Sequence, residues 1–127
     1  MENLPSVTAD SDRLEQVFVN LLNNAADAMP EGGKVSVESA ACQVEGRPCL
    51  VVSIADTGSG ISEEHLKRIF DPFFSTKPKG QGTGLGLSVS YNIIRGHGGQ
   101  IEVESRVDRG TVFRVRLPAD GTRDKEL

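Results

Sequence analysis

Three segments between residues 56 and 86 place the tightest limits on how this chain folds. They read Asp-Thr-Gly-Ser-Gly-Ile at 56–61, Phe-Asp-Pro-Phe-Phe-Ser-Thr-Lys at 70–77 and Gly-Gln-Gly-Thr-Gly-Leu-Gly at 80–86. Glycine adopts backbone conformations that other residues avoid, and it lets a second group approach the main chain closely. We therefore expect the main chain to lie against another group at these segments.

The first segment follows an apolar run, Leu50 to Ala55, which predicts a buried strand that ends at Asp56. A carboxylate only accepts hydrogen bonds, so Asp56 suits an amino group. Gly58 and Gly60 allow a flat ring to lie against the backbone.

The third segment leads into a helical pattern from about Gly84 to Arg95, with Leu85, Val89, Ile93 and Ile94 inward. Unpaired N–H groups at such a helix end bind phosphate. An amino-bearing ring at one end and phosphate at the other indicate a nucleotide. The segment is not a Gly-x-x-x-x-Gly-Lys-Ser/Thr loop, because no Lys-Ser/Thr pair closes it, and no strand precedes it as in a dinucleotide fingerprint.

A long amphipathic helix is predicted near the N-terminus, capped by Asp10, Ser11 or Asp12 and ending before Pro30. Asn20, Asn24 and Asp27 form a polar stripe beside its apolar face. Amide oxygens suit a Mg²⁺ ion that already carries phosphate ligands; the alternative is that these side chains only bond to neighbouring loops. The predicted apolar positions are Leu14, Val17, Phe18, Leu21, Leu22, Ala25 and Met29.

The remaining pattern predicts an α+β two-layer sandwich, a mixed, mostly antiparallel sheet covered by three helices. Residues 71–83 are expected to form a mobile lid, which Phe73 and Phe74 anchor unless both rings are ordinary core. We expect a lead-in at 1–9 with an edge strand at 7–9, one domain at 10–118 and a disordered tail at 119–127. The other predicted elements are a strand at 34–44 exposed on one side, a loop at 43–48, a strand at 50–55, a short helix from Ser62 to about Ile69, and strands at 100–105 and 111–117 joined by a turn at 108–110.

Composition narrows the possible partners. The chain has 127 residues, with 14 basic against 18 acidic side chains and a net charge of −4. No basic stripe is present, so nucleic acid and anionic membrane are not expected as partners. The sequence contains no apolar run of about 18 residues and no signal-peptide pattern, so neither a membrane span nor export is expected. Cys42 and Cys49 flank the predicted loop and are expected to be reduced thiols, although a bridge stays open.

The motifs together resemble the four boxes of the catalytic, ATP-binding domain of sensor histidine kinases, from the superfamily that also holds DNA gyrase, the heat-shock chaperone and the mismatch-repair ATPases. Residues 20–25 look like the N box, 56–61 the first glycine box, 70–74 the F box and 82–87 the second glycine box. The resemblance covers residues 12–118, and the Phe-Ser-Thr-Lys sequence at 74–77 is most similar to nitrogen-regulation-type kinases.

The resemblance implies a Bergerat-type ATP-binding fold and a role for each box. Asp56 is expected to bind the adenine amino group with support from Thr111, and so to select ATP over GTP. Asn24 is expected to ligate Mg²⁺, Asn20 and Asn24 to act at the catalytic centre, and Lys77 to bind phosphate with the second glycine box. The residues expected around ATP are Asn20, Asn24, Asp27, Asp56, Gly58, Gly60, Ile61, Phe73, Phe74, Thr76, Lys77, Gly82, Thr83, Gly84, Leu85, Gly86, Leu87 and Thr111.

Two positions depart from the family pattern. Asp27 and Ala28 stand where many members have Lys or Arg and then Tyr, so no phosphate contact from a basic side chain is expected there. Asp108 replaces the first of two glycines before Thr111, which is expected to alter only the shape of the loop.

Kinases of this family phosphorylate a histidine in a separate dimerisation segment. Neither His65 nor His97 fits that pattern, so both are expected to be structural, His97 as a cation at a helix end. Hydrolysing relatives carry a Glu where Asn20 stands, so slow ATP hydrolysis is expected. The resemblance implies a cytoplasmic, monomeric kinase domain that transfers the γ-phosphoryl group to this histidine, for relay to a response regulator. The alternatives are a serine kinase of the anti-sigma type and a regulatory domain that only senses nucleotide.

Overall fold

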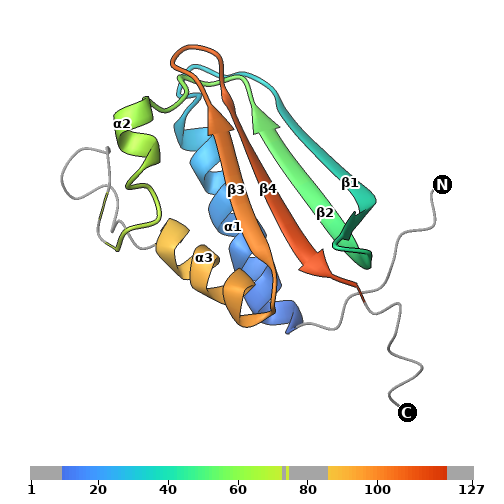
Figure 1. Ribbon diagram of the computed structural model, residues 1–127. Coiled ribbons are helices and arrows are strands. Elements are labelled where there is room, and N and C mark those ends of the chain that lie inside the picture. The colour runs from blue at the N-terminus through green and yellow to red at the C-terminus, as the bar shows by residue number, and fades with distance from the viewer. Residues whose placement is uncertain (1–9, 73, 75–85, 120–127) are drawn as a thin grey trace.

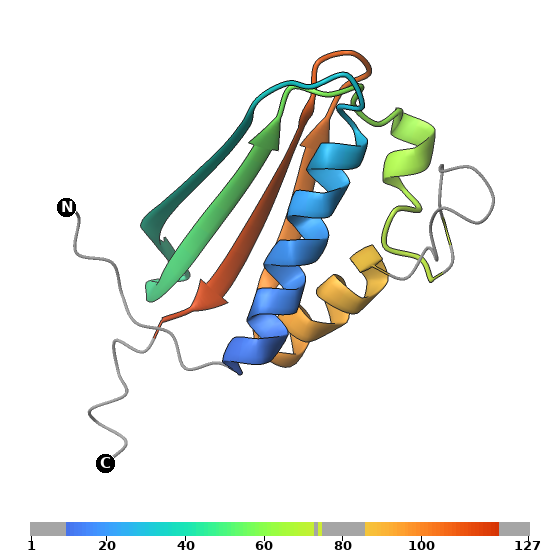
Figure 2. The same ribbon diagram turned by 180° about the vertical axis from the view of Figure 1, so that it is seen from behind.

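The computed structural model describes residues 10–72, 74 and 86–119. It is an α+β sandwich in two layers, with the helices packed on one face of a four-stranded sheet (Figure 1 and, from behind, Figure 2). The strand order is β1-β2-β4-β3, and every pairing is antiparallel. This confirms the predicted fold class. The elements are α1 (Ser11–Asp27), β1 (Val35–Val44), β2 (Arg47–Asp56), α2 (Glu63–Leu66), α3 (Gly86–Gly96), β3 (Gln100–Ser105) and β4 (Thr111–Pro118).

Helix α1 begins where the sequence predicts. Asp10 is its N-cap, and the Asp10 carboxylate accepts hydrogen bonds from the N–H groups of Asp12 and Arg13. Its buried stripe contains Val17, Leu21 and Ala25. The prediction that Leu22 faces the core is wrong, because Leu22 is 41% exposed. Leu22 lies about 140° around the helix from Val17, at the margin of the stripe that meets the core.

The turn between β1 and β2 is tighter than predicted. Instead of a loop at 43–48, Glu45 and Gly46 alone connect the strands, with φ of 52° and 79°. Positive φ at both central residues is typical of the two-residue turns that fit the twist of a hairpin. Strand β1 ends at Val44 as predicted, whereas β2 is longer than the sequence indicated and runs from Arg47.

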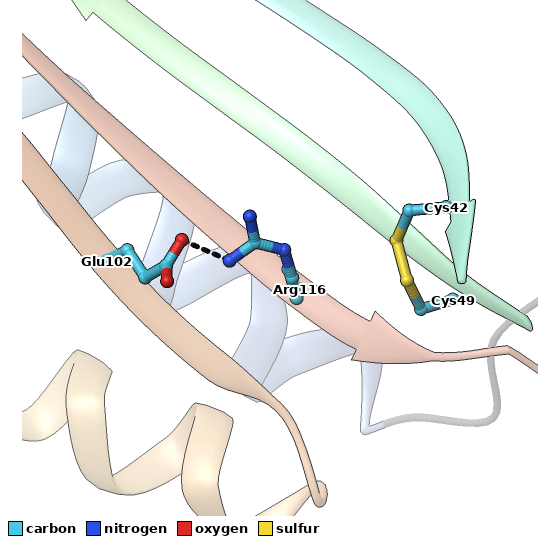
Figure 3. The surroundings of a disulfide bond; sticks show 4 residues. All are labelled: Cys42, Cys49, Glu102 and Arg116. Carbon is cyan, nitrogen blue, oxygen red and sulfur yellow. Dashed lines mark hydrogen bonds and ion pairs between the residues drawn. A yellow bond between two sulfur atoms is a disulfide. The ribbon is translucent and has the colours of Figure 1, made fainter. Parts of the chain in front are cut away.

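The register of this hairpin also overturns the expectation of reduced thiols. Cys42 lies directly opposite Cys49, their Cα atoms are 4.9 Å apart, and a disulfide joins them (Figure 3). That separation lies within the range that a disulfide can bridge. The position of the two cysteines on either side of the predicted loop already allowed them to face each other, and only the expected oxidation state is wrong.

The burial of β1 and β2 differs from the prediction. Strand β1 is exposed along both faces apart from the half-buried Cys42, so it is not covered on one side as expected. Val37, on the face that points toward the helix layer, is 57% exposed. Strand β2 is mostly half-buried rather than continuously buried, with only Cys49 and Ile54 fully enclosed. Figures 1 and 2 give the reason, since β1 is the outer edge of the sheet and none of the helices in the described part of the chain lies over it.

The core lies between the inner face of β2, β3 and β4 and the helices. Alternate residues of β4 point into it, including Phe113, Val115 and Leu117. The outward residues of β4 include Arg114 and Arg116, which form ion pairs with Glu104 and Glu102 of β3 (Figure 3 shows the pair of Arg116 and Glu102).

The short helix and α3 agree with the sequence in position but not in every boundary. Ser62 caps α2 as predicted, although the α-helix ends at Leu66 rather than near Ile69. Helix α3 is described from Gly86 to Gly96, and Ile93 and Ile94 are buried in it as expected. No helix among the described residues is long and apolar enough to cross a membrane.

Candidate adenine and magnesium site

The end of β2 places Asp56 beside the start of β4. Asp56 is the last residue of β2, and its cross-strand partner is Thr111, the first residue of β4. The half-buried Asp56 carboxylate accepts the N–H of Gly58 at 2.8 Å through one oxygen, Oδ1. Thr111 is 4% exposed. Two residues that the sequence assigned to one site, 55 positions apart in the chain, are therefore neighbours.

The glycines around Asp56 are required by close backbone packing. A Cβ atom on Gly58 would lie 2.5 Å from the carbonyl oxygen of Ala28. Gly60 has φ of 75°, and a Cβ atom there would overlap the carbonyl oxygen of Arg106. The N–H of Ser59 donates to Ala28 O at 3.1 Å, so the first glycine box is bonded to the C-terminal end of α1. No residue with a side chain fits at either glycine without displacing backbone.

Ser105 was missed by the sequence reasoning, although it holds this end of the site together. Its Oγ accepts the N–H of Ile61 at 2.7 Å and donates to Gly110 O at 2.8 Å. The Thr111 hydroxyl lies 2.8 Å from the same Oγ. Because the Ser105 proton is used on Gly110, Thr111 donates to Ser105 and keeps its lone pairs for an incoming donor. A serine at the end of a strand carries no sequence signal of such a role.

Asn20, from the polar stripe of α1, contacts the first turn of α3. Asn20 and Asn24 are half-buried, whereas Asp27 is exposed. Asn20 Nδ2 donates to Gly86 O and to Ser90 Oγ, each at 3.2 Å. Half-buried amide groups of this kind fit a Mg²⁺ ion whose other ligands come from phosphate and water. The described residues hold no cluster of three or more His, Cys, Asp or Glu side chains, so they form no dedicated all-protein metal cage.

Phe70 and Phe74, the two aromatic residues of the F box that the structure describes, pack in different directions. Phe70 contacts Tyr91 and Phe113, with ring centroids 5.3 and 6.5 Å apart. Phe74 contacts the ring of His65 with centroids 5.4 Å apart, and the Arg68 guanidinium lies 4.8 Å from the Phe74 centroid. Phe74 therefore packs on α2 and the turn that follows it.

The second histidine is structural, but not as the cation that the sequence suggested. His97 Nε2 accepts the N–H of Asp10 at 3.0 Å, so that nitrogen carries no proton in this arrangement. Nδ1 lies 2.8 Å from Ile93 O and donates to it. The neutral ring joins the start of α1 to the end of α3.

Several predicted residues lie outside the described part of the chain. The predicted lid falls there except for residues 71, 72 and 74, as do the edge strand at 7–9 and the tail beyond residue 119. The site residues in this group are Phe73, Thr76, Lys77, Gly82, Thr83, Gly84 and Leu85. Gly86 and Leu87 are described, both half-buried at the start of α3.

Comparisons with known proteins agree with this geometry. The family model for histidine kinase-, DNA gyrase B-, and HSP90-like ATPases matches residues 9–121. Sporulation kinase E of Bacillus subtilis is 42% identical over 93% of this chain and 15% of its own length. Sensor kinase CckA of Brucella abortus is 45% identical over 88% and 13%, and the Escherichia coli sensor histidine kinase ZraS is 42% identical over 96% and 25%. The chain thus spans at most a quarter of the length of these relatives.

Solved structures agree with the sequence relatives. The catalytic domain of histidine kinase ThkA has a TM-score of 0.75 and 40% identity, covering 89% of this chain and 71% of that one. Full-length ShkA in complex with AMPPNP has a TM-score of 0.75 and 32% identity, covering 91% of this chain and 23% of that one. The chain therefore belongs to the histidine kinase-, DNA gyrase B- and HSP90-like ATPase family, as the catalytic ATP-binding domain of a sensor histidine kinase.

Proposed function

We propose that the domain binds Mg-ATP with adenine at Asp56 and the triphosphate between α1 and the second glycine box, and transfers the γ-phosphoryl group to a histidine outside residues 1–127. The observation that carries this proposal is the pairing of Asp56 with the buried Thr111 at one end of the sheet. One oxygen of Asp56 accepts the N–H of Gly58, and the carboxylate can accept a further hydrogen bond from the adenine amino group.

This geometry favours ATP over GTP. Adenine presents an amino donor where guanine presents a carbonyl oxygen, which an ionised carboxylate repels. Thr111 supplies a second polar contact, because its hydroxyl proton goes to Ser105 and its oxygen can accept. We assign adenine recognition to these two side chains, with Gly58, Gly60 and Ile61 forming the surface under the ring.

Asn24 is proposed as the protein ligand of Mg²⁺, which when bound neutralises charge on the phosphates. Asn20, one helical turn earlier, lies at the catalytic centre, and its side chain is an amide rather than a carboxylate. An amide cannot act as a general base toward water. The domain is therefore expected to position ATP for an incoming imidazole and to hydrolyse ATP slowly when alone.

The partners follow from this chemistry. The acceptor is the phosphoacceptor and dimerisation domain of the parent kinase, and a response regulator receives the phosphoryl group from it. We propose that the domain is a monomer and acts in the cytoplasm. The Phe-Ser-Thr-Lys sequence at 74–77 supports assignment to the nitrogen-regulation type.

Transfer to histidine is tested with a supplied acceptor. The 127-residue chain is incubated with γ-labelled ATP, Mg²⁺ and the dimerisation domain of a similar kinase, and then with acid. Label on the acceptor that is lost in acid supports phosphohistidine. Acid-stable label would indicate a serine kinase, and ATP binding with no transfer to any tested acceptor would favour a domain that only senses nucleotide. Rapid multiple-turnover hydrolysis without acceptor would contradict the assigned role of Asn20.

A further inference from the structure

Ser90 is a buried polar residue in the middle of α3. It is 0% exposed and lies among apolar side chains that form the contact of α3 with the core. Alanine is a better helix former than serine and would fill nearly the same space. A buried hydroxyl is also costly unless it has hydrogen-bond partners. The partners of Ser90 therefore indicate what the hydroxyl contributes.

Ser90 forms a closed triangle with Asn20 and Gly86. Its Oγ donates to Gly86 O at 2.9 Å, one helical turn back. Asn20 Nδ2, from α1, lies 3.2 Å from that same carbonyl oxygen and 3.2 Å from Ser90 Oγ. The triangle joins Asn20 of α1 to Gly86, which is the first residue of α3 and belongs to the second glycine box.

Donor and acceptor chemistry leaves one arrangement for this triangle. Gly86 O is a carbonyl oxygen and only accepts, so both neighbours give it protons. The single Ser90 proton is used there, and Ser90 therefore accepts from Asn20. Both partners select the nitrogen of the Asn20 amide, so the amide oxygen is not used in the triangle.

We propose that Ser90 is a positioning residue that fixes the orientation of the Asn20 amide, so that its nitrogen holds α3 and its oxygen serves the Mg-ATP site. This proposal rests on the proposed function for the use of that oxygen, but the triangle itself does not depend on it. Without the hydroxyl, only Gly86 O selects the nitrogen, and one N–H of Asn20 loses its acceptor. Since Gly86 begins α3, the same loss weakens the contact between the start of α3 and α1.

The test is a double-mutant cycle on the full chain, measured by calorimetric titration with Mg-ATP. Ser90→Ala is expected to weaken binding about three- to tenfold, the effect of one net hydrogen bond. In the Asn20→Ala background the same substitution is expected to change binding less than twofold, because the hydroxyl acts through Asn20. Ser90→Thr keeps a hydroxyl. Its loss of binding free energy relative to the wild type is expected to be at most half of the loss measured for Ser90→Ala.

Two results would overturn the proposal. An equal loss from Ser90→Ala in both backgrounds would mean that the hydroxyl affects packing alone. No loss in either background would mean that the orientation of Asn20 does not depend on Ser90. Melting temperatures of all five proteins, including Ser90→Thr, identify any variant that fails to fold.

A second measurement needs no nucleotide and separates this proposal from the proposed function. The Asn20 side-chain NH₂ is observed by ¹⁵N NMR, and its exchange with solvent is expected to be at least about tenfold faster in Ser90→Ala than in the wild type. Unchanged exchange would contradict the triangle. If the wild-type chain bound no ATP but showed this difference, the proposed function would fail while the positioning role of Ser90 remained.

Discussion

The two ends of the β1–β2 ladder are held in contrasting ways. At one end, Asp56 and the first glycine box are enclosed by backbone from the end of α1 and the turn before β4, and carbonyl oxygens occupy the space that side chains would need. At the other end, the turn at Gly46 faces open space and a disulfide joins the strands. Backbone packing fixes the first end and a covalent bond fixes the second. Substitutions should therefore affect nucleotide binding at the first end and only stability at the second.

The sharpest contrast is expected from one substitution made at both ends. Gly60→Ala places a side chain at φ of 75° and against Arg106 O, and should destabilise the fold by about 3 kcal/mol or more and abolish ATP binding. Gly46→Ala has nearly the same φ, 79°, but meets nothing within 4 Å, and should cost only about 1–2 kcal/mol. Urea denaturation of both variants measures the difference. Equal losses would show that close packing does not distinguish the two ends.

Asp56→Asn tests the chemistry of the enclosed end without changing its shape. The Asn oxygen still accepts the N–H of Gly58, so stability should stay close to the wild type. The loss of the charge should weaken ATP binding about ten- to a hundredfold, since hydrogen bonds to charged groups contribute roughly 1.5–3 kcal/mol. Asp108→Asn, in the nearby turn, is the matched control and should bind ATP normally. Normal ATP binding by the Asp56 variant would contradict the assignment of Asp56 as the adenine-binding residue.

Removing the disulfide tests the opposite end. Cys42→Ala with Cys49→Ala opens a bridge of sequence separation 7 and should lower the free energy of unfolding by about 2 kcal/mol. ATP affinity should remain within about twofold, because the bridge lies at the far end of β2 from Asp56. Reducing agent added to the wild type should reproduce both results. A large loss of ATP affinity would show that the two ends of the β1–β2 ladder are coupled, and would contradict the claim that the disulfide end affects only stability.

The smallest effect is expected on the outer face of the sheet. Glu104→Gln breaks the ion pair between Glu104 and Arg114. The nitrogen and oxygen atoms of this pair are 2.9 Å apart, and the Glu104 side chain is 72% exposed. Exposed pairs contribute little, so the free energy of unfolding should fall by about 0.5 kcal/mol or less. Urea denaturation at low and high salt checks this, and a loss above about 1 kcal/mol would give this face a larger structural role.

Local patterns predicted most of the fold because their causes are local. The N-cap of α1, the turn glycines and the outlines of the strands depend on nearby residues, and each was found close to its predicted place. The exposure of β1 and the pairing of Cys42 with Cys49 depend on which helix covers which strand and on the register of one turn. The exposure of β1 is set by tertiary packing, which no window of sequence contains, whereas the turn at Glu45 and Gly46 is local and its length was predicted wrongly.

The candidate site shows the same division. Asp56 was predicted from its place after an apolar run and Thr111 from the family resemblance, and the structure pairs the two residues. Ser105 and Ser90 were missed because a serine has the same local pattern whether it is solvated or bonded to partners 44 or 70 positions away. Their importance follows only from burial and from hydrogen-bond partners on other elements.

The most direct test of the central claim is a calorimetric titration of the 127-residue chain with ATP and with GTP, each with and without Mg²⁺. The expected result is saturable ATP binding that Mg²⁺ strengthens, with GTP at least about tenfold weaker because it lacks the amino donor for Asp56. Equal binding of the two nucleotides, or binding of neither, would contradict the assignment of Asp56 and Thr111 as the adenine site.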